Sequence, residues 1–272
     1  MSSDILVVGN GYIGKKVSAA LSCPVSQKII KGVSDAQEEI AEYRPRVLIN
    51  CVGFVGRNVD ECELDKDNTL TSNSFIPLIL AEACLRSKVK LVHISSGCIF
   101  HYDYAKDQPL SEERAPDYLN LFYSRSKIYS ERALGPLLKE YPFLILRIRV
   151  PLDTRPDPRN LLTKLVSYKK VIDAPNSVTY IPDFLGALRH LLKIDAAGIY
   201  NVVSKNPLVY PRLMEVYKKY VPGFNYEVVD FHALKMNRTN LALSCAKLER
   251  AGFKMRDINE VLEECVREYV KY

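Results

Sequence analysis

The sequence lacks the features that mark membrane, secreted and repetitive proteins. No apolar run reaches the ~18 residues that a transmembrane helix needs, and no basic segment precedes the first hydrophobic residues, as it would in a secretory signal. No repeat or low-complexity stretch occurs in the 272 residues. We therefore expect a cytoplasmic protein without membrane association, with a length that fits one large domain or one and a half.

Paired cysteines and clustered histidines are missing too. The seven cysteines are an odd number and include no Cys-x-x-Cys pair, which argues against a disulfide framework and a zinc site. The four histidines show no metal-ligand spacing; they are His93, His101, His190 and His232. The sequence therefore predicts no metal, and thiols that stay reduced.

A concentrated basic surface is also absent, although the formal net charge is +6. A mildly basic protein can attract a phosphorylated small molecule or a nucleic acid. The basic doublets are scattered without interleaved aromatic residues, which is typical of solvated helix faces; examples are Lys15-Lys16, Lys169-Lys170 and Lys218-Lys219. We therefore expect no nucleic-acid partner.

Short apolar runs alternate with helical patterns in the first half of the chain. The predicted strands are 5–8, 27–30, 47–50, 89–95 and 143–148, and the predicted helices are 12–21, 74–86 and 123–139. This alternation is typical of an α/β protein with a Rossmann-like, doubly wound parallel sheet. Such sheets bind ligands beyond the carboxyl ends of their strands, here the loops after residues 8, 50, 95 and 148.

The pattern changes after residue 150, where four prolines break the chain into short pieces. Helices are predicted at 182–193, 211–221 and 258–270, with an extended segment at 225–229. We predict a dinucleotide-binding domain over residues 1–150 and a smaller, mostly C-terminal substrate-binding lobe over 151–272. Residues from about 176 to 204 are expected to return to the sheet domain.

A glycine-rich turn joins the first predicted strand to the first predicted helix. Its spacing, GxGxxG, permits a tight turn, close approach of the backbone to a pyrophosphate and close packing of helix on strand. The helix N-terminus then supplies N–H donors. We predict that this turn binds a dinucleotide through Gly9, Asn10, Gly11, Tyr12, Ile13 and Gly14.

The acidic residue that often follows such a turn after ~20 positions is not evident. Lys28 and Lys31 stand in that region instead. They favour the 2′-phosphate of NADPH, although two solvated lysines would look the same. The predicted cofactor is therefore NADPH or NADH.

Tyr123 and Lys127 are four residues apart in a predicted helix, so they share one face of it. A neighbouring ammonium stabilises a phenolate, which suits Tyr123 to donate a proton to the alkoxide that develops during hydride transfer. Ser96, at the end of a predicted strand, can hydrogen-bond the reacting carbonyl oxygen, with Ser95 as the second choice. The order of glycine turn, Ser and Tyr-x-x-x-Lys resembles the short-chain dehydrogenase/reductase superfamily in its extended form.

Six further segments narrow this resemblance: 58–63, 97–100, 122–124, 146–151, 157–160 and 175–179. Together they resemble the nucleotide-rhamnose synthase group, the UDP-4-keto-6-deoxy-glucose 3,5-epimerase/4-reductases, which are related to dTDP-4-dehydrorhamnose reductases. The resemblance covers nearly the whole chain and is densest from residue 91 to 180. It implies NAD(P)H as reductant and a UDP- or dTDP-linked 4-keto-6-deoxy-glucose as substrate, converted to the rhamnose nucleotide.

The resemblance also implies roles for individual residues. Cys98, in Gly-Cys-Ile-Phe, and Lys164, in Asn-x-x-Thr-Lys, would exchange protons at C3 and C5, which the C4 ketone acidifies. The loop after the third strand, Cys51, Val52 and Gly53, would pass close to the cofactor. Substrate contacts would come from Cys98, Asn160, Lys164, Asn176, Thr179 and Arg238, the last at the diphosphate.

Residue type alone leaves other interpretations open. A lone cysteine is most often a small buried hydrophobe, and Lys164 or Arg238 could be ordinary surface residues. The chain could be a 4-reductase without epimerase activity, a nucleotide-sugar 4-epimerase that retains its NAD, or a non-catalytic, dinucleotide-binding regulatory subunit. Long helices flanking such sheets often pair subunits, so we expect a homodimer.

Overall fold

The computed structural model describes residues 4–231 and 237–272, so His232 lies outside the described residues. The chain forms two compact units. The first unit comprises Met1–Ile99, Pro116–Arg147 and Leu191–Tyr200, and the second comprises Phe100–Ala115, Ile148–His190 and Asn201–Tyr272. The boundaries differ from those drawn from the sequence: Phe100–Ala115 belongs with the C-terminal half, and the segment that returns to the first unit is shorter than residues 176–204.

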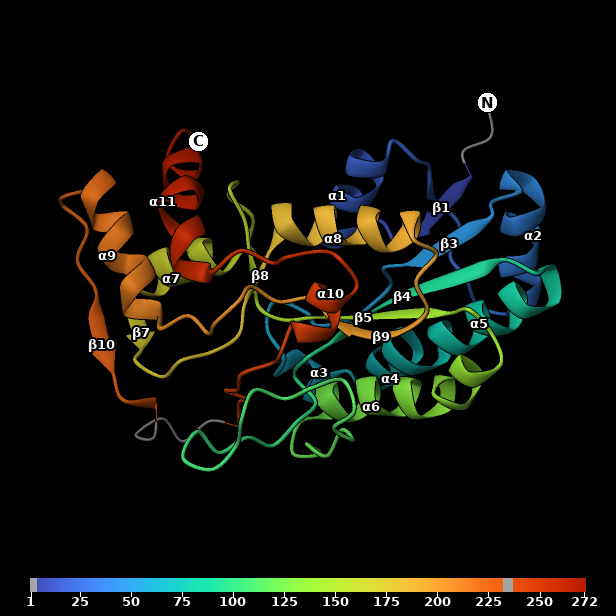
Figure 1. The fold of residues 1–272 in the computed structure, drawn as a ribbon, viewed down its shortest axis with the longest axis horizontal. Coiled ribbons are helices and arrows are strands. Elements are labelled where there is room, and N and C mark those ends of the chain that lie inside the picture. The colour runs from blue at the N-terminus through green and yellow to red at the C-terminus, as the bar shows by residue number, and fades with distance from the viewer. Residues whose placement is uncertain (1–3, 232–236) are drawn as a thin grey trace. The chain divides into compact units, whose positions relative to one another are not determined.

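A six-stranded sheet forms the centre of the first unit (Figure 1). Its order is β2-β1-β3-β4-β5-β9, and β1 pairs in parallel with β2 and β3, as β3 does with β4. The strands are β1 Ile5–Val8, β2 Val25–Ser26, β3 Val47–Asn50, β4 Lys90–Ser96, β5 Leu144–Ile148 and β9 Gly198–Asn201. The predicted α/β class with a parallel, doubly wound sheet is confirmed.

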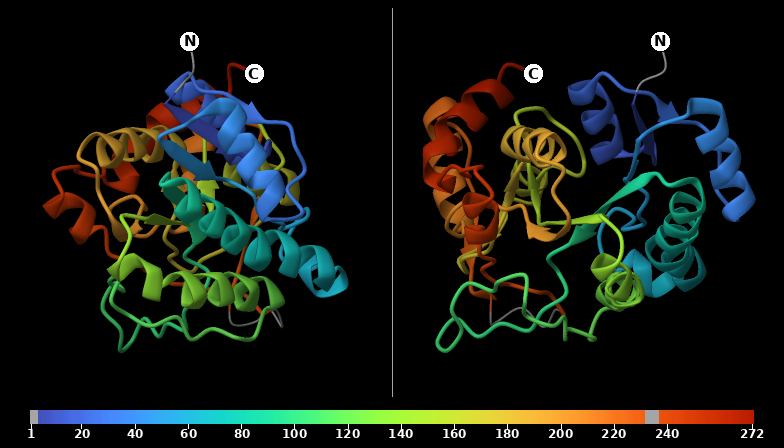
Figure 2. Two further views of the ribbon diagram at one scale, coloured as in Figure 1. Left: turned by 90° about the vertical axis from the view of Figure 1, so that its right-hand side faces the viewer. Right: turned by 45° about the vertical axis from the view of Figure 1, so that its right-hand side comes forward.

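Helices cover the sheet because the strands are apolar on both faces. Leu6 and Val8 face a core that also contains residues of α2, α5 and α6. Gly14 and Val17, the buried residues of α1, do not belong to this core. Figures 1 and 2 show α5 and α6 side by side along the sheet. The helices are α1 Tyr12–Leu21, α2 Val33–Tyr43, α3 Glu61–Leu64, α4 Lys66–Leu70, α5 Ile76–Ser87 and α6 Phe122–Leu134, with a π-helical turn at Thr71–Phe75 and a 3₁₀ turn at Pro136–Lys139.

Local rules account for the departures from the predicted elements. The second strand is Val25–Ser26 rather than 27–30, since the Ser26 hydroxyl accepts the N–H of Lys28 and turns the chain there. The helix predicted over 123–139 ends at Leu134 because Pro136 has no N–H to continue it.

The second unit has two small parallel strand pairs and its own core. Strand β6 (Pro151–Leu152) pairs with β8 (Thr179–Tyr180), and β7 (Lys170–Ile172) pairs with β10 (Glu227–Val229). Helices α9 (Tyr210–Tyr220) and α11 (Ile258–Tyr269) lie side by side (Figure 2), and with α7 (Leu161–Tyr168) they bury one apolar cluster. The remaining helices are α8 Ile181–Lys193, which runs from the second unit into the first, and α10 Ala246–Arg250.

Candidate active site

The glycine-rich turn is built for close backbone approach. Gly9 has φ +108°, and a Cβ there would lie 2.6 Å from the Val52 nitrogen. A Cβ on Gly14 would lie 1.8 Å from the Gly9 oxygen, so α1 can pack on β1 only with glycine at this position. Around Gly11 a Cβ would meet no atom within 4 Å. The turn is therefore tightly packed at Gly9 and Gly14 and leaves open space at Gly11, and this shape fits a dinucleotide.

The N-terminus of α1 is available to an anion. Gly11 is its N-cap, no side chain caps the helix, and no acidic residue stands in its first turn. The first N–H groups of a helix have no acceptor within the helix itself, and they lie at the positive end of its dipole. In the sheet, β1 lies between β2 and β3, so the strand order reverses beside this turn, where open α/β sheets bind their ligands. These residues fit the pyrophosphate of a dinucleotide.

Three buried polar side chains shape the loop after β3, and the sequence reasoning missed them. Asn50 accepts the N–H of Val52 through Oδ1 at 2.9 Å, and its Nδ2 lies 3.1 Å from Nδ1 of His93. Asn73, in the π-helical turn, accepts the N–H of Phe54 and donates to its carbonyl, each at 2.8 Å. Burial holds the pKa of His93 well below its ordinary value, so the ring is neutral. Asn at a strand end was the available signal.

Lys127 reaches the same loop from α6. Its side chain is 4% exposed, and a Cβ on Gly53 would lie 3.2 Å from its Nζ. Burial lowers its pKa to about 8. Among residues 4–231 and 237–272, no group accepts a hydrogen bond from this ammonium. A buried cation with unused donors beside a glycine-lined loop fits a polar ligand such as a ribose hydroxyl.

Tyr123, Ser96 and Cys98 belong to the first unit, as Lys127 does. Tyr123 is half-buried in the first turn of α6, four residues before Lys127, so the predicted shared helical face is confirmed. The hydroxyl oxygen of Ser96 accepts the N–H of Cys98 at 3.1 Å, which leaves the Ser96 proton for another acceptor. Ser124 donates to the carbonyl of Cys98 and ties that turn to α6.

Lys164 belongs to the second unit, on α7. It is half-buried, and burial together with Arg159 lowers its pKa while Asp157 opposes the shift. An ammonium with a lowered pKa can more readily give and take a proton near neutrality. Asn160, four residues earlier, is fully buried and caps α7 by accepting the N–H of Leu162 at 3.1 Å.

Three residues expected to contact substrate also make hydrogen bonds within the second unit. The Asn160 amide also donates to the carbonyls of Asp153 and Arg155, and the buried Thr179 hydroxyl donates to Val202 at 2.6 Å. Asn176 accepts from Arg149 at 2.9 Å and donates to the Tyr210 hydroxyl at 2.9 Å. These hydrogen bonds of Asn160, Asn176 and Thr179 stabilise the second unit, and their contact with substrate stays a prediction. Arg238 is half-exposed and donates to the carbonyl of Asn237.

The residues after β2 bear on the choice of cofactor. Asn10 donates to Gln27 at 3.3 Å, so the turn after β2 lies beside the glycine-rich turn. Lys28 pairs with Glu38 on α2, which competes with any phosphate for it, and this pairing raises the Lys28 pKa. Lys31 is exposed.

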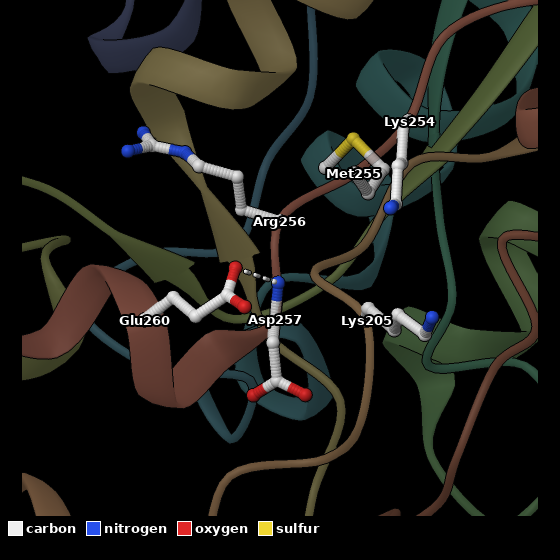
Figure 3. Close-up of a pocket in the computed structure, with 6 residues that line it drawn as sticks. All are labelled: Lys205, Lys254, Met255, Arg256, Asp257 and Glu260. Atoms are coloured by element: carbon white, nitrogen blue, oxygen red, sulfur yellow. Dashed lines mark hydrogen bonds between the residues drawn. The ribbon is translucent and has the colours of Figure 1, made fainter.

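A separate pocket of about 310 Å³ lies in the second unit (Figure 3). Glu260 accepts the N–H of Asp257 and Asp257 accepts that of Asn259, so these carboxylates cap α11. Arg256 pairs with Asp183 and Glu264. The pocket contains no predicted site residue. Within the described ranges, no cluster of His, Cys, Asp and Glu could hold a metal, and no helix in them is long and apolar enough to span a bilayer.

Comparison with known proteins gives a consistent result. The family profile described as the RmlD substrate binding domain matches residues 8–180. A bifunctional dTDP-4-dehydrorhamnose 3,5-epimerase/dTDP-4-dehydrorhamnose reductase of Arabidopsis thaliana is 32% identical over 244 residues, which cover 85% of this chain and 79% of that protein. A trifunctional UDP-glucose 4,6-dehydratase/UDP-4-keto-6-deoxy-D-glucose 3,5-epimerase/UDP-4-keto-L-rhamnose-reductase of the same plant is 31% identical over 242 residues. They cover 85% of this chain and 36% of that longer protein.

Solved structures share the fold over nearly the whole chain. The L780 UDP-rhamnose synthase of Acanthamoeba polyphaga mimivirus superposes with a TM-score of 0.89 at 24% identity, covering 97% of this chain and 98% of that one. The dTDP-4-dehydrorhamnose reductase of Bacillus anthracis, determined in complex with NADP, has a TM-score of 0.83 at 21% identity and covers 98% of each chain. The nucleotide-rhamnose family resemblance and the Rossmann-like fold predicted from the sequence are confirmed.

Proposed function

Because the chain belongs to the RmlD substrate binding domain family, we propose that it is an NADPH-dependent enzyme of nucleotide-rhamnose synthesis. It would epimerise UDP- or dTDP-4-keto-6-deoxy-glucose at C3 and C5 and then reduce the C4 ketone. The observation that carries this proposal is the placement of Ser96, Tyr123 and Lys127 in one compact unit with the glycine-rich turn. The similarity to a bifunctional epimerase/reductase over 79% of its length supports it.

The proposed reduction assigns one task to each residue. A reduced nicotinamide, when bound, supplies the hydride that C4 accepts. Tyr123 donates the proton that converts the C4 oxygen to a hydroxyl, and the Ser96 hydroxyl hydrogen-bonds that oxygen while its negative charge grows. Lys127, charged below its pKa of about 8, stabilises the Tyr123 phenolate and donates to the ribose of the cofactor.

The proposed epimerisation must precede reduction, because only the ketone makes the hydrogens on C3 and C5 acidic. Inversion at each carbon needs a base on one face and a proton donor on the other. We assign these tasks to Cys98 and Lys164. The lowered pKa of Lys164 supports the assignment, since the ammonium then loses its proton at a smaller free-energy cost and can act as a base.

NADPH is the proposed reductant, and a homodimer in the cytoplasm is the proposed state of the protein. No carboxylate at the end of β2 opposes a 2′-phosphate, since Ser26, Gln27 and Lys28 stand there. The first unit has exposed apolar side chains that support self-association, among them Leu64, Phe75 and Tyr129. Light scattering on the purified protein measures its mass directly; a monomeric mass would remove the dimer from the proposal.

Deuterium exchange tests the two activities separately. In D₂O without NADPH, the enzyme should exchange the C3 and C5 hydrogens of UDP- or dTDP-4-keto-6-deoxy-glucose. Cys98→Ala and Lys164→Ala should lose this exchange yet still reduce ketosugar that was epimerised beforehand. Tyr123→Phe should retain exchange and lose reduction by ~10²–10⁴-fold.

Each alternative has its own result in this assay. Reduction by an enzyme that shows no exchange would leave a 4-reductase alone. Tight NADPH binding with neither activity would indicate a regulatory subunit. Exchange that survives in both the Cys98 and the Lys164 variants would place the epimerase bases elsewhere.

A further inference from the structure

Three buried polar side chains from three elements of the first unit form one network behind the proposed reductase residues. The Ser95 hydroxyl, on β4, donates to Oε1 of Glu131 on α6 at 2.5 Å. Arg147, on β5, donates to Oε2 of the same carboxylate from its NH2 group at 2.6 Å and to both oxygens from Nε at 3.1 Å. The exposed fractions are 3% for Ser95, 4% for Glu131 and 1% for Arg147.

Such a network contributes little to the free energy of folding. Removing two charges from water costs about as much as their attraction returns, so apolar side chains of similar volume often serve as well or better. What apolar packing does not supply is a fixed direction. The bidentate contact and the serine hydrogen bond hold β4, β5 and α6 in one register through well-directed contacts.

The register involves the reactive groups directly. Glu131 lies four residues after Lys127 and eight after Tyr123, on the same face of α6. Ser95 immediately precedes Ser96 at the end of β4. The Glu131 carboxylate therefore joins α6, which carries the proposed proton donor Tyr123, to the end of β4. That strand end carries Ser96, whose hydroxyl is proposed to hydrogen-bond the same C4 oxygen of the substrate.

We propose that Glu131, held by Arg147, is a positioning residue for the keto reduction proposed above. It fixes α6, with Tyr123 and Lys127, against the strand end with Ser96. It touches neither substrate nor cofactor in this role.

Electrostatics gives the network a second effect on the same helix. The Glu131 carboxylate raises the pKa of Lys127 and so offsets part of the lowering that burial causes. The other groups facing Lys127 are Cys51 after β3 and Cys62 on α3, which also raise it, together with the neutral His93 on β4. Glu131→Gln removes the negative charge and leaves the Arg147 cation unmatched, and both changes lower the Lys127 pKa.

The test compares Ser95→Ala and Glu131→Gln with Ser130→Ala in the full-length protein. Ser130 is a matched control, since it is a fully buried serine on α6 whose hydroxyl donates only to the Lys127 carbonyl within the helix. We expect Ser95→Ala to lower kcat for reduction at least tenfold, because a small misplacement of reacting groups costs up to ~10²-fold. Its KM for NADPH and its C3 and C5 exchange should stay within about twofold of wild type.

Glu131→Gln should lower kcat similarly and also move the alkaline limit of reduction to lower pH, by about one pH unit. A structural role alone would lower the rate equally at all pH values. If Glu131→Gln does not fold, Ser95→Ala still tests the positioning role, because it leaves the ion pair of Glu131 and Arg147 intact. Unchanged kcat in Ser95→Ala, or an unmoved alkaline limit in Glu131→Gln, would overturn the positioning role.

Wild-type turnover separates this inference from the proposed function. If the wild-type enzyme reduces no ketosugar, the proposed function fails. The pH dependence of NADPH binding, followed by its fluorescence, then shows whether Glu131 still controls Lys127. A binding curve that Glu131→Gln does not shift would refute the control of Lys127 by Glu131 on which the inference depends, and a shifted curve would support that control.

Discussion

Replacing Lys127 with methionine separates the energetic cost of the buried ammonium from its use. Burial lowers the Lys127 pKa from 10.5 to about 8, and each pKa unit corresponds to ~1.36 kcal/mol. The charged side chain therefore destabilises the folded protein by ~3 kcal/mol at neutral pH. Methionine fills a similar volume without a charge. We expect Lys127→Met to raise the free energy of unfolding by up to ~3 kcal/mol at pH 7 and to abolish reduction.

The difference in the free energy of unfolding between Lys127→Met and the wild-type protein should decrease as pH rises. Since the folded pKa lies below the unfolded one, the unfolded chain binds more protons between about pH 8 and pH 10.5. The wild-type protein therefore gains stability as pH rises through that window. The amount by which its free energy of unfolding falls below that of Lys127→Met should therefore shrink by ~2 kcal/mol between pH 7 and pH 9.5.

Urea denaturation of both proteins without cofactor, at pH 7, 8 and 9.5, measures this difference. Lys139→Met is the control, because Lys139 is exposed in the same unit and its replacement should change stability by less than ~0.5 kcal/mol. NADPH should stabilise the wild-type protein more than Lys127→Met. The reasoning is refuted if Lys127→Met is no more stable than wild type at pH 7, or if the difference is the same at all three pH values.

Three further variants test other parts of the site. Gly14→Ala should abolish NADPH binding or folding, since its Cβ would lie 1.8 Å from the Gly9 oxygen, whereas Gly32→Ala, whose nearest neighbour would be 3.9 Å away, should bind normally in a fluorescence titration. Replacing Lys28 and Lys31 with alanine should weaken NADPH ~10–100-fold more than NADH if they meet the 2′-phosphate, as one charge-assisted contact is worth ~1.5–3 kcal/mol; equal losses for both cofactors would show solvated lysines. Asn160→Ala should lower the free energy of unfolding by ~1–3 kcal/mol, because buried groups lose their partners; unchanged stability in urea would contradict its assignment to the fold.

The parts of the fold that depend only on residues close together along the chain were predictable from the sequence. Strands β1 and β3 and helix α1 lie where the patterns predicted, because an apolar run or a 3.6-residue period belongs to a single segment. The glycine-rich turn and the i, i+4 pair of Tyr123 and Lys127 are local in the same sense. The family resemblance extended this to Cys98 and Lys164.

The pairing of buried polar groups was decided only by the tertiary structure. Ser95 and Glu131 are 36 residues apart, and Asn50 and His93 are 43 apart. Their contacts exist because the strand register and the helix packing bring these positions together. Motif spacing also could not reveal that Asn160, Asn176 and Thr179 use their polar atoms for the fold, because a motif carries residue types but not hydrogen-bond partners. The sequence by itself therefore determined the fold class, the family and several elements such as β1, α1 and β3. The folded chain decided which buried polar side chains pair with one another, since a buried polar group must find its partner wherever the packing puts one.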